Sequence, residues 1–288
     1  MFSTGKELLT ICNEKKLPIW EIAILDEIES TEASREDILH KTMTAFKVMK
    51  NSTQDPGDKR TMGGFIGGEY HKVDTYRQKG HTLLGDVANR AMMRALACSQ
   101  YNASMGRICA APTAGSCGII PAAFITGAEE IGCKDECIIQ GILTAAAVGK
   151  IIVQNATVAG AEGGCQAECG SAAAMAAAGL VEMAGGTPAQ ALNASAIAFK
   201  NIMGLICDPI AGLVESPCSK RNASGVLNAM ASADLALANV ESIVPFDEVV
   251  ATMYSVGLAM HPNFKETAKG GIATSPTGKA LSKEILGK

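Results

Sequence analysis

Apolar residues recur at helical spacing along most of the chain, whereas the alternation that is typical of strands is scarce. Two amphipathic stretches open the sequence, at 3–29 and 34–51, and Pro18 predicts a break or kink in the first. In the second stretch Ser34 is a natural N-cap, and two acidic residues in the following turn complement the helix dipole. We therefore predict that the first fifty residues are helical.

Residues 51–81 have a different character, because Pro56-Gly57 and two Gly-Gly pairs mark turns among dense polar groups. Without any low-complexity run, this stretch is predicted to be a functional glycine-rich loop within a domain, not a linker. Beyond it, helical spacing continues almost to the end of the chain, with Thr187-Pro188 as a cap-then-proline start. The predicted helices span 83–101, 118–131, 135–154, 165–184, 188–203, 224–240 and 246–260.

Composition refines the fold class. Hydrophobic residues make up 48% of the 288 residues and aromatic residues only 4%, so the apolar bulk consists mainly of small and aliphatic side chains. Repeated Ala and Gly over 170–186 predict a helix that is buried on most sides and closely approached by its neighbours. This length suits one large domain or two small ones. We expect a mostly α fold, with residues 1–288 forming a single compact helical domain.

Charge and hydropathy exclude two classes of partner. The formal net charge is −4 and no cluster of Lys and Arg appears, which argues against nucleic-acid binding. No signal-peptide pattern opens the chain. The apolar stretch 138–158 contains Gln140, Lys150, Gln154 and Asn155, so we do not expect it to span a membrane. The sequence predicts a cytoplasmic protein.

The ten cysteines are therefore informative, because a reducing compartment disfavours disulfides and favours metal ligation or catalysis. Cys165 follows two glycines at the entry to a predicted helix, where free backbone N–H groups favour the thiolate. Cys207 and Cys218 lie in loops that contain Pro and Gly. This spacing does not match a zinc template, whereas three cysteines on a cubane iron–sulfur cluster leave one iron open as a Lewis acid.

The alternative is that most of these cysteines are small buried hydrophobes, which is common in helical cores. Spacing alone does not separate the two interpretations. We assign four cysteines to the core outright: Cys12, Cys98, Cys133 and Cys137.

Three longer motifs resemble one known family. Asn-Ala-Ser-Met-Gly-Arg-Ile at 102–108, Ala-Pro-Thr-Ala-Gly-Ser-Cys-Gly-Ile-Ile-Pro-Ala at 111–122 and Lys-Glu-Thr-Ala-Lys-Gly-Gly-Ile-Ala at 265–273 are similar to motifs of the iron–sulfur L-serine dehydratase α domain. The segments around the cysteines at 165, 207 and 218 also resemble its cluster-binding segments, and the resemblance is strongest from about residue 60 onward.

The resemblance implies that Cys165, Cys207 and Cys218 ligate a [4Fe-4S] cluster. Three other cysteines near the motifs do not carry over as ligands and are read as core residues or neighbours of the ligands: Cys109, Cys117 and Cys169. It also implies conversion of L-serine to pyruvate and ammonia, and a separate β subunit as partner. We find no lysine motif with a phosphate cup that would suit pyridoxal phosphate.

The catalytic base is predicted to be a histidine, because an ordinary histidine pKa lies near neutrality. His71 and His261 are the first candidates and His81 the next, whereas His40 fits an exposed position on an amphipathic helix. A hydrogen-bonded structural role is the alternative for each of them.

For the substrate carboxylate, the candidate contacts are Thr113 and Ser116, in a turn that opens the predicted helix at 118, and Arg107. Ordinary N-capping by Ser116 and loop anchoring by Arg107 are the alternatives. Two other functions stay open: a cysteine desulfidase of the same superfamily, and a non-catalytic helical subunit whose cysteines are core residues.

Overall fold

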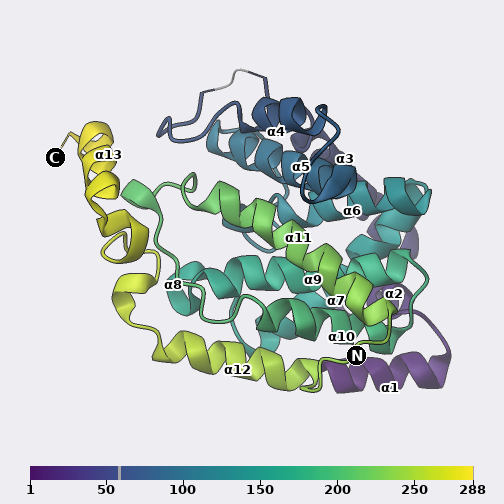
Figure 1. Ribbon diagram of the computed structural model, residues 1–288. Helices are drawn as coiled ribbons and strands as arrows, with labels where there is room; N and C mark the ends of the chain where they lie inside the picture. The colour runs from purple at the N-terminus through teal and green to yellow at the C-terminus, as the bar shows by residue number, and fades with distance from the viewer. Residues whose placement is uncertain (58–59, 288) are drawn as a thin grey trace.

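The computed structural model describes residues 1–57 and 60–287, and these residues form helices joined by turns and loops (Figure 1). The only β pairing among these residues is an isolated bridge between Cys207 and Lys265. The mostly α prediction is confirmed. In chain order the α-helices are α1 (Gly5–Lys15), α2 (Ile19–Thr31), α3 (Arg35–Ser52), α4 (Glu69–Arg77), α5 (Gly85–Ala103), α6 (Ile119–Ile131), α7 (Asp135–Asn155), α8 (Gly160–Gly163), α9 (Ser171–Met183), α10 (Pro188–Lys200), α11 (Cys218–Leu237), α12 (Phe246–Ala259) and α13 (Pro276–Leu286).

Helix α9 forms the centre of the molecule and packs against α6, α7, α10 and α11 (Figure 1). It carries the Ala- and Gly-rich sequence, and every residue of it except Glu182 is buried. At Gly179 an added Cβ would overlap the Phe124 ring and lie 2.6 Å from the carbonyl oxygen of Gly141. Small side chains therefore allow the close helix approach that the composition predicted.

Helix α7 is long and apolar enough to cross a membrane by length and composition alone. It packs against α9 on one side and α2 on another, and most of its apolar window is buried inside the protein. Its Lys150 forms an ion pair with the buried Asp26 of α2. We therefore interpret α7 as a core helix of a soluble fold.

Local capping explains several helix starts. Ser34 accepts a hydrogen bond from the Asp37 N–H in a capping box, and Thr187 does the same with Gln190 in front of Pro188. Pro18 precedes the first residue of α2 and separates it from α1. These three sequence-based predictions are confirmed.

Three segments differ from the pattern-based expectation. The stretch 51–81, expected to be a loop, also contains α4 and the end of α3. Helix α11 begins at Cys218, six positions before the predicted start at 224. Helix α13, which no periodicity argument predicted, follows the cap-then-proline pair Ser275-Pro276, and the Ser275 hydroxyl accepts from the Gly278 N–H.

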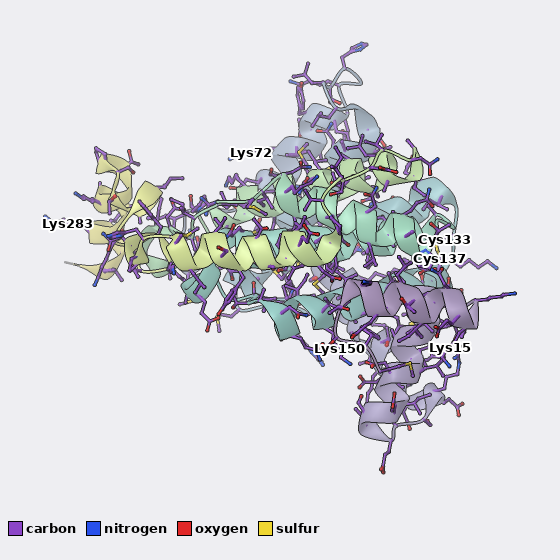
Figure 2. The ribbon with its side chains drawn as sticks, turned by 90° about the horizontal axis from the view of Figure 1, so that it is seen from below. Lys15, Lys72, Cys133, Cys137, Lys150 and Lys283 are labelled. Carbon is purple, nitrogen blue, oxygen red and sulfur yellow. A yellow bond between two sulfur atoms is a disulfide. The ribbon has the colours of Figure 1, made fainter. Side chains whose placement is uncertain are left out.

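On the outer face, α12 and α1 lie along one side of the molecule (Figure 2) and both contact α10. The Asp247 carboxylate in the first turn of α12 accepts from the N–H groups of Gly5 and Lys6, at 2.6 and 2.9 Å. A cavity of about 800 Å³ lies between these helices and the loop before α12. None of the predicted site residues lines it.

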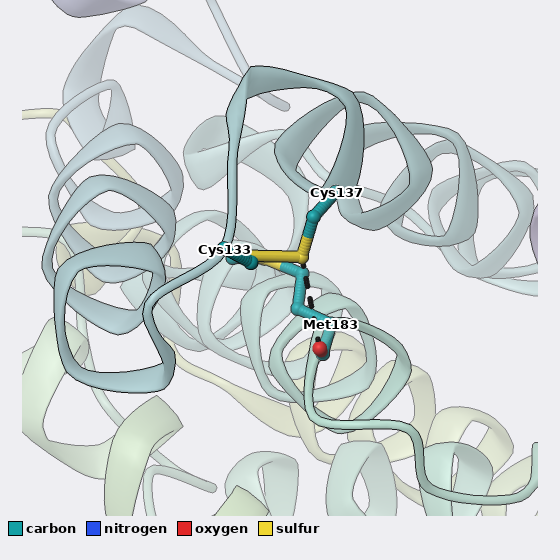
Figure 3. Close-up of a disulfide and its surroundings, with 3 residues drawn as sticks. All are labelled: Cys133, Cys137 and Met183. Atoms are coloured by element: carbon teal, nitrogen blue, oxygen red, sulfur yellow. Dashed lines mark hydrogen bonds between the residues drawn. A yellow bond between two sulfur atoms is a disulfide. The ribbon is translucent and has the colours of Figure 1, made fainter.

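Cys133 and Cys137 form a disulfide (Figure 3), which corrects their assignment to the core. Both side chains are only partly buried. Gly132 ends α6 in the left-handed conformation, and Cys137 lies in the first turn of α7, so the short turn brings the two sulfurs together. The Sγ of Cys137 also lies 3.6 Å from the carbonyl oxygen of Met183 at the end of α9.

Candidate metal centre

The site begins at Cys165, which follows Gly164 in the left-handed region and precedes one π-helical turn, Gln166–Gly170, that runs directly into α9. Such π turns are frequent at functional sites. Gln166 fixes this turn to distant segments. Its side-chain oxygen accepts from the Gly204 N–H at 2.8 Å, and its side-chain nitrogen donates to the Met253 carbonyl oxygen at 3.0 Å.

The second cysteine is held by backbone pairing with the C-terminal segment. The Cys207 N–H donates to the Phe264 carbonyl oxygen at 2.8 Å, and its own carbonyl oxygen accepts from the Glu266 N–H at 2.8 Å. The main chain at Cys207 is thereby fixed on both sides, and the segment 264–266 lies beside it.

Ligand atoms of Cys165, Glu168 and Cys207 lie within 4.8 Å of one another, and all three residues are buried. The Cys207 Sγ is 3.6 Å from Oε2 of Glu168, and the Cys165 Sγ is 3.5 Å from that of Cys169. Cys165 and Cys207, which are 42 positions apart in the sequence, therefore meet at one place. Cys169, predicted to be a core residue or a neighbour of the ligands, directly contacts Cys165.

Cys218 is the first residue of α11 and is also buried. Burial, followed by the negative charges of Cys165 and Glu168, raises the pKa of the Cys218 thiol to about 12. It is not a member of the close group formed by Cys165, Glu168 and Cys207, but it is near enough to sense their charge.

The electrostatics of the site favour a thiolate at Cys165. Hydrogen bonds from the Cys169 and Cys207 thiols, assisted by the Arg221 guanidinium, hold the pKa of Cys165 well below its ordinary value in spite of burial. The pKa values of Cys169 and Cys207 are raised in turn, because these thiols donate to the Cys165 sulfur and are buried.

Glu168 is a site residue that the sequence analysis did not single out. Burial and the neighbouring Cys165 charge raise its pKa to about 7, while a hydrogen bond from Thr113 opposes that rise. The backbone closes around its carboxylate, since a Cβ on Gly115 would lie 3.1 Å from Oε1 and one on Gly160 2.6 Å from Oε2. The sequence does contain a signal for Glu168, because it follows Cys165 by three residues and this spacing places two side chains on the same face of a helical turn.

The turn at 113–116 lies against this carboxylate. The Thr113 and Ser116 hydroxyls are 3.1 Å apart, and Ser116 is fully buried. Asn222 of α11 ties the turn down by donating to the Gly115 carbonyl oxygen at 2.7 Å and accepting from the Gly118 N–H at 2.9 Å. Ser116 does not cap α6, which begins after Gly118 without a side-chain cap.

The other candidates are spread more widely. Arg107 is exposed in the loop after α5, and His81 is exposed as well. His71 lies on α4, about half exposed, with Nε2 3.2 Å from Asp55. His261 is exposed and accepts from the Asn263 N–H at 3.2 Å, but its ring packs edge-on against Phe264, the residue that pairs with Cys207. Of these four, His261 is therefore tied most directly to the cysteines.

The remaining free cysteines lie outside the group formed by Cys165, Glu168 and Cys207. Cys12 and Cys98 are fully buried, in agreement with the core assignment. The Sγ of Cys98 lies 3.7 Å from that of Cys117, which is buried in front of α6, and Cys109 is partly buried.

The donor set suits an iron–sulfur cluster. Thiolates are the usual ligands of such clusters. The thiols of Cys165, Cys169 and Cys207 lie together in a buried region, and the Arg221 guanidinium interacts with Cys165. The hydroxyls of Ser171 and Ser219, two positions after Cys169 and one after Cys218, are buried without a hydrogen-bond partner among the described residues. Buried polar atoms are rarely left unpaired, so these two hydroxyls are compatible with a further group in the site.

The described residues therefore form a helical protein that holds a buried candidate metal centre of several thiols and one carboxylate. The comparisons with known proteins specify the family. Residues 14–273 match the family model of the serine dehydratase alpha chain. The chain belongs to this family.

Two relatives match along essentially their whole length. The L-serine dehydratase alpha chain of Peptoniphilus asaccharolyticus is 47% identical over 99% of both chains. The probable L-serine dehydratase alpha chain of Bacillus subtilis (strain 168) is 45% identical over 100% of this chain and 96% of its own. The L-serine dehydratase of Helicobacter pylori is 35% identical over 94% of this chain but only 61% of its own length.

Proposed function

We propose that the chain is the catalytic α chain of an L-serine dehydratase, which converts L-serine to pyruvate and ammonia. The observation that carries the proposal is the buried convergence of Cys165, Glu168 and Cys207 in a chain that matches the α chains of such enzymes end to end. The convergence also argues against a non-catalytic scaffold, since core cysteines need no carboxylate beside them.

Cys165, Cys207 and Cys218 would hold a [4Fe-4S] cluster in this proposal. When bound by three protein thiolates, the cluster supplies an open iron that acts as a Lewis acid toward the serine hydroxyl. Two features of the chain support these ligands: the thiolate character of Cys165 and the placement of all three thiols on separately anchored segments.

The chain's own groups would bind and orient the substrate. The Thr113 hydroxyl interacts with Glu168 and lies 3.1 Å from the Ser116 hydroxyl, so both hydroxyls are placed to donate hydrogen bonds to the serine carboxylate. Arg107, which is exposed, would reach that carboxylate only if its loop folds over the site. For removal of the α-proton we retain His261 and His71, with His261 favoured because its segment pairs with Cys207.

Assembly is inferred from the relatives' names, because the designation alpha chain implies a β chain. We propose that residues 1–288 form one catalytic domain that functions in the cytoplasm with a separate β subunit.

The test is anaerobic assay of the purified chain, with and without its β chain, on L-serine and on L-cysteine. The proposal expects pyruvate from L-serine at a rate well above that from L-cysteine. Faster sulfide release from L-cysteine than pyruvate release from L-serine would indicate a desulfidase. Absence of product from both substrates, with the β chain present, would overturn the proposal.

A further inference from the structure

Arg221 is a largely buried cation whose hydrogen bonds hold the segment around Cys207 to α11. Its side chain is only 14% exposed. One guanidinium nitrogen donates to the Ile206 carbonyl oxygen at 2.9 Å, and the other pairs with the Asp208 carboxylate at 2.8 Å. The same guanidinium interacts with the Cys165 sulfur.

These contacts join the segments of all three candidate ligands. Ile206 and Asp208 are the two neighbours of Cys207 in the chain, and Arg221 itself lies three residues after Cys218 on α11. The Arg221 charge also favours the thiolate form of Cys165. A planar guanidinium with several donors is the side chain best suited to such a junction, because it can bond in several directions without losing its charge.

The junction extends to the C-terminal segment through Asp208, which is 1% exposed. While one carboxylate oxygen binds Arg221, the other accepts from the Ile272 N–H at 2.7 Å. Gly271 is in the left-handed region at φ 61° and packs so closely on Asp208 that any Cβ there would overlap the carboxylate. Both oxygens of this buried carboxylate are therefore used, one by each segment.

We propose that Arg221 and Asp208 are a positioning pair, which holds the three cysteine segments and residues 270–275 in one arrangement and compensates the negative charge of the cluster. The inference rests on the proposed function for the cluster, but the anchoring of the C-terminal segment does not depend on it. Comparing Arg221→Gln with Arg221→Lys separates the effect of the positive charge from the effect of the guanidinium hydrogen bonds.

The first experiment compares Arg221→Gln and Arg221→Lys with Lys220→Gln as the matched control. Lys220 is the adjacent residue, but it is exposed and pairs with Glu69 on the surface. After anaerobic reconstitution, Arg221→Gln is expected to retain several-fold less iron than the control. Its remaining cluster should have a lower midpoint reduction potential, because a nearby cation favours the more negative reduced form. Arg221→Lys should restore the midpoint reduction potential more fully than it restores the amount of iron retained.

The second experiment follows the C-terminal segment without any cluster. In Asp208→Asn the side chain has only one oxygen, so it cannot accept from both Arg221 and the Ile272 N–H as the carboxylate does. Residues 270–275 should therefore be held less firmly. Limited trypsinolysis after the exposed Lys269 should then be several-fold faster than in Lys220→Gln, with an unchanged cleavage rate after Lys16 at the end of α1. Arg221→Gln should show the same selective increase.

Iron retention, reduction potential and cleavage rates equal to those of Lys220→Gln would overturn the proposal. If Arg221→Gln does not fold, as judged by circular dichroism, Asp208→Asn and Arg221→Lys provide the same comparison. A wild-type chain that binds no iron would contradict the proposed function alone, because the cleavage result stands without a cluster.

Discussion

At the scale of single residues, burial controls the chemistry of the site. Cys165, Glu168 and Cys207 are withdrawn from water, so each charge depends on its immediate neighbours, and Arg221 is the cation that the fold supplies. Cys165, whose pKa is held low by the neighbouring thiols and by Arg221, is thereby prepared for metal ligation, whereas an isolated buried cysteine has a raised pKa. Cys12 shows the contrast, since burial raises its pKa to about 11.

The proposed set of three ligands predicts the outcome of cysteine replacement. Cys165→Ala, Cys207→Ala and Cys218→Ala should each abolish most iron binding and lower serine turnover by about 100-fold or more, because each removes one of three ligands. Iron analysis of anaerobically prepared protein and a pyruvate assay measure both effects. Cys12→Ala is the matched control and should keep full iron content and activity.

A second prediction concerns the base. His261→Ala should reduce kcat by about 10²–10⁴-fold while the visible absorbance of the cluster stays intact, because general-base catalysis contributes on that order. His71→Ala serves as the comparison on α4. Full activity in both variants would remove these two histidines as candidates.

At the scale of elements, the contact between α2 and α7 depends on a buried carboxylate. Burial opposes ionisation of Asp26, but hydrogen bonds from Lys150 and from the Met1 ammonium outweigh it and hold the pKa of Asp26 below its ordinary value. Its ion pairs therefore stabilise the folded state above the unfolded pKa, and that stability is lost as the pH falls through the lower folded value.

Asp26→Asn should accordingly lower the free energy of unfolding at neutral pH by about 1–3 kcal/mol. The difference from wild type should shrink below about pH 4, where the unfolded Asp26 begins to take up its proton. Urea unfolding at several pH values measures this. Glu29→Gln, an exposed position on the same helix, should change stability by less than about 0.5 kcal/mol, and an equal effect of both changes would contradict the assignment.

The central helix provides another element-scale prediction. Gly179→Ala should destabilise the protein by about 1–3 kcal/mol, because the added methyl group meets the buried Phe124 ring and the backbone of α7. Thermal or urea unfolding tests it. Ser224→Ala, at an exposed helical position of α11, should be neutral or slightly stabilising, and a similar loss there would contradict the packing argument.

Local signals account for what the sequence predicted correctly at this scale. Caps such as Ser34 and Thr187 act within one turn, and the small side chains around Gly179 reveal close packing directly. The disulfide between Cys133 and Cys137 was missed because cellular redox context outweighed their spacing in our prediction.

The candidate site was less predictable, because tertiary folding assembles it. Cys165, Cys207 and Cys218 came from a resemblance, and spacing alone left their role open. Helical spacing could have found Glu168, but no local pattern pairs Arg221 with Asp208 or brings residue 272 to that carboxylate.

At the scale of the whole molecule, the helices packed around α9 form a frame, and the site is built from the loops and turns at their ends. This division suits a catalytic centre, because loops can approach one another without breaking helical hydrogen bonds. In the proposed assembly a β chain completes the enzyme, and we expect its addition to raise serine turnover by about tenfold or more if it orders the exposed loops near the site.

The most direct test of the central claim is the iron and acid-labile sulfide content of the chain purified without oxygen, measured together with its serine turnover. We predict about four irons and four sulfides per chain, as a [4Fe-4S] cluster requires, and turnover that disappears when they are removed. A colourless chain without iron that still releases pyruvate from L-serine would contradict the account.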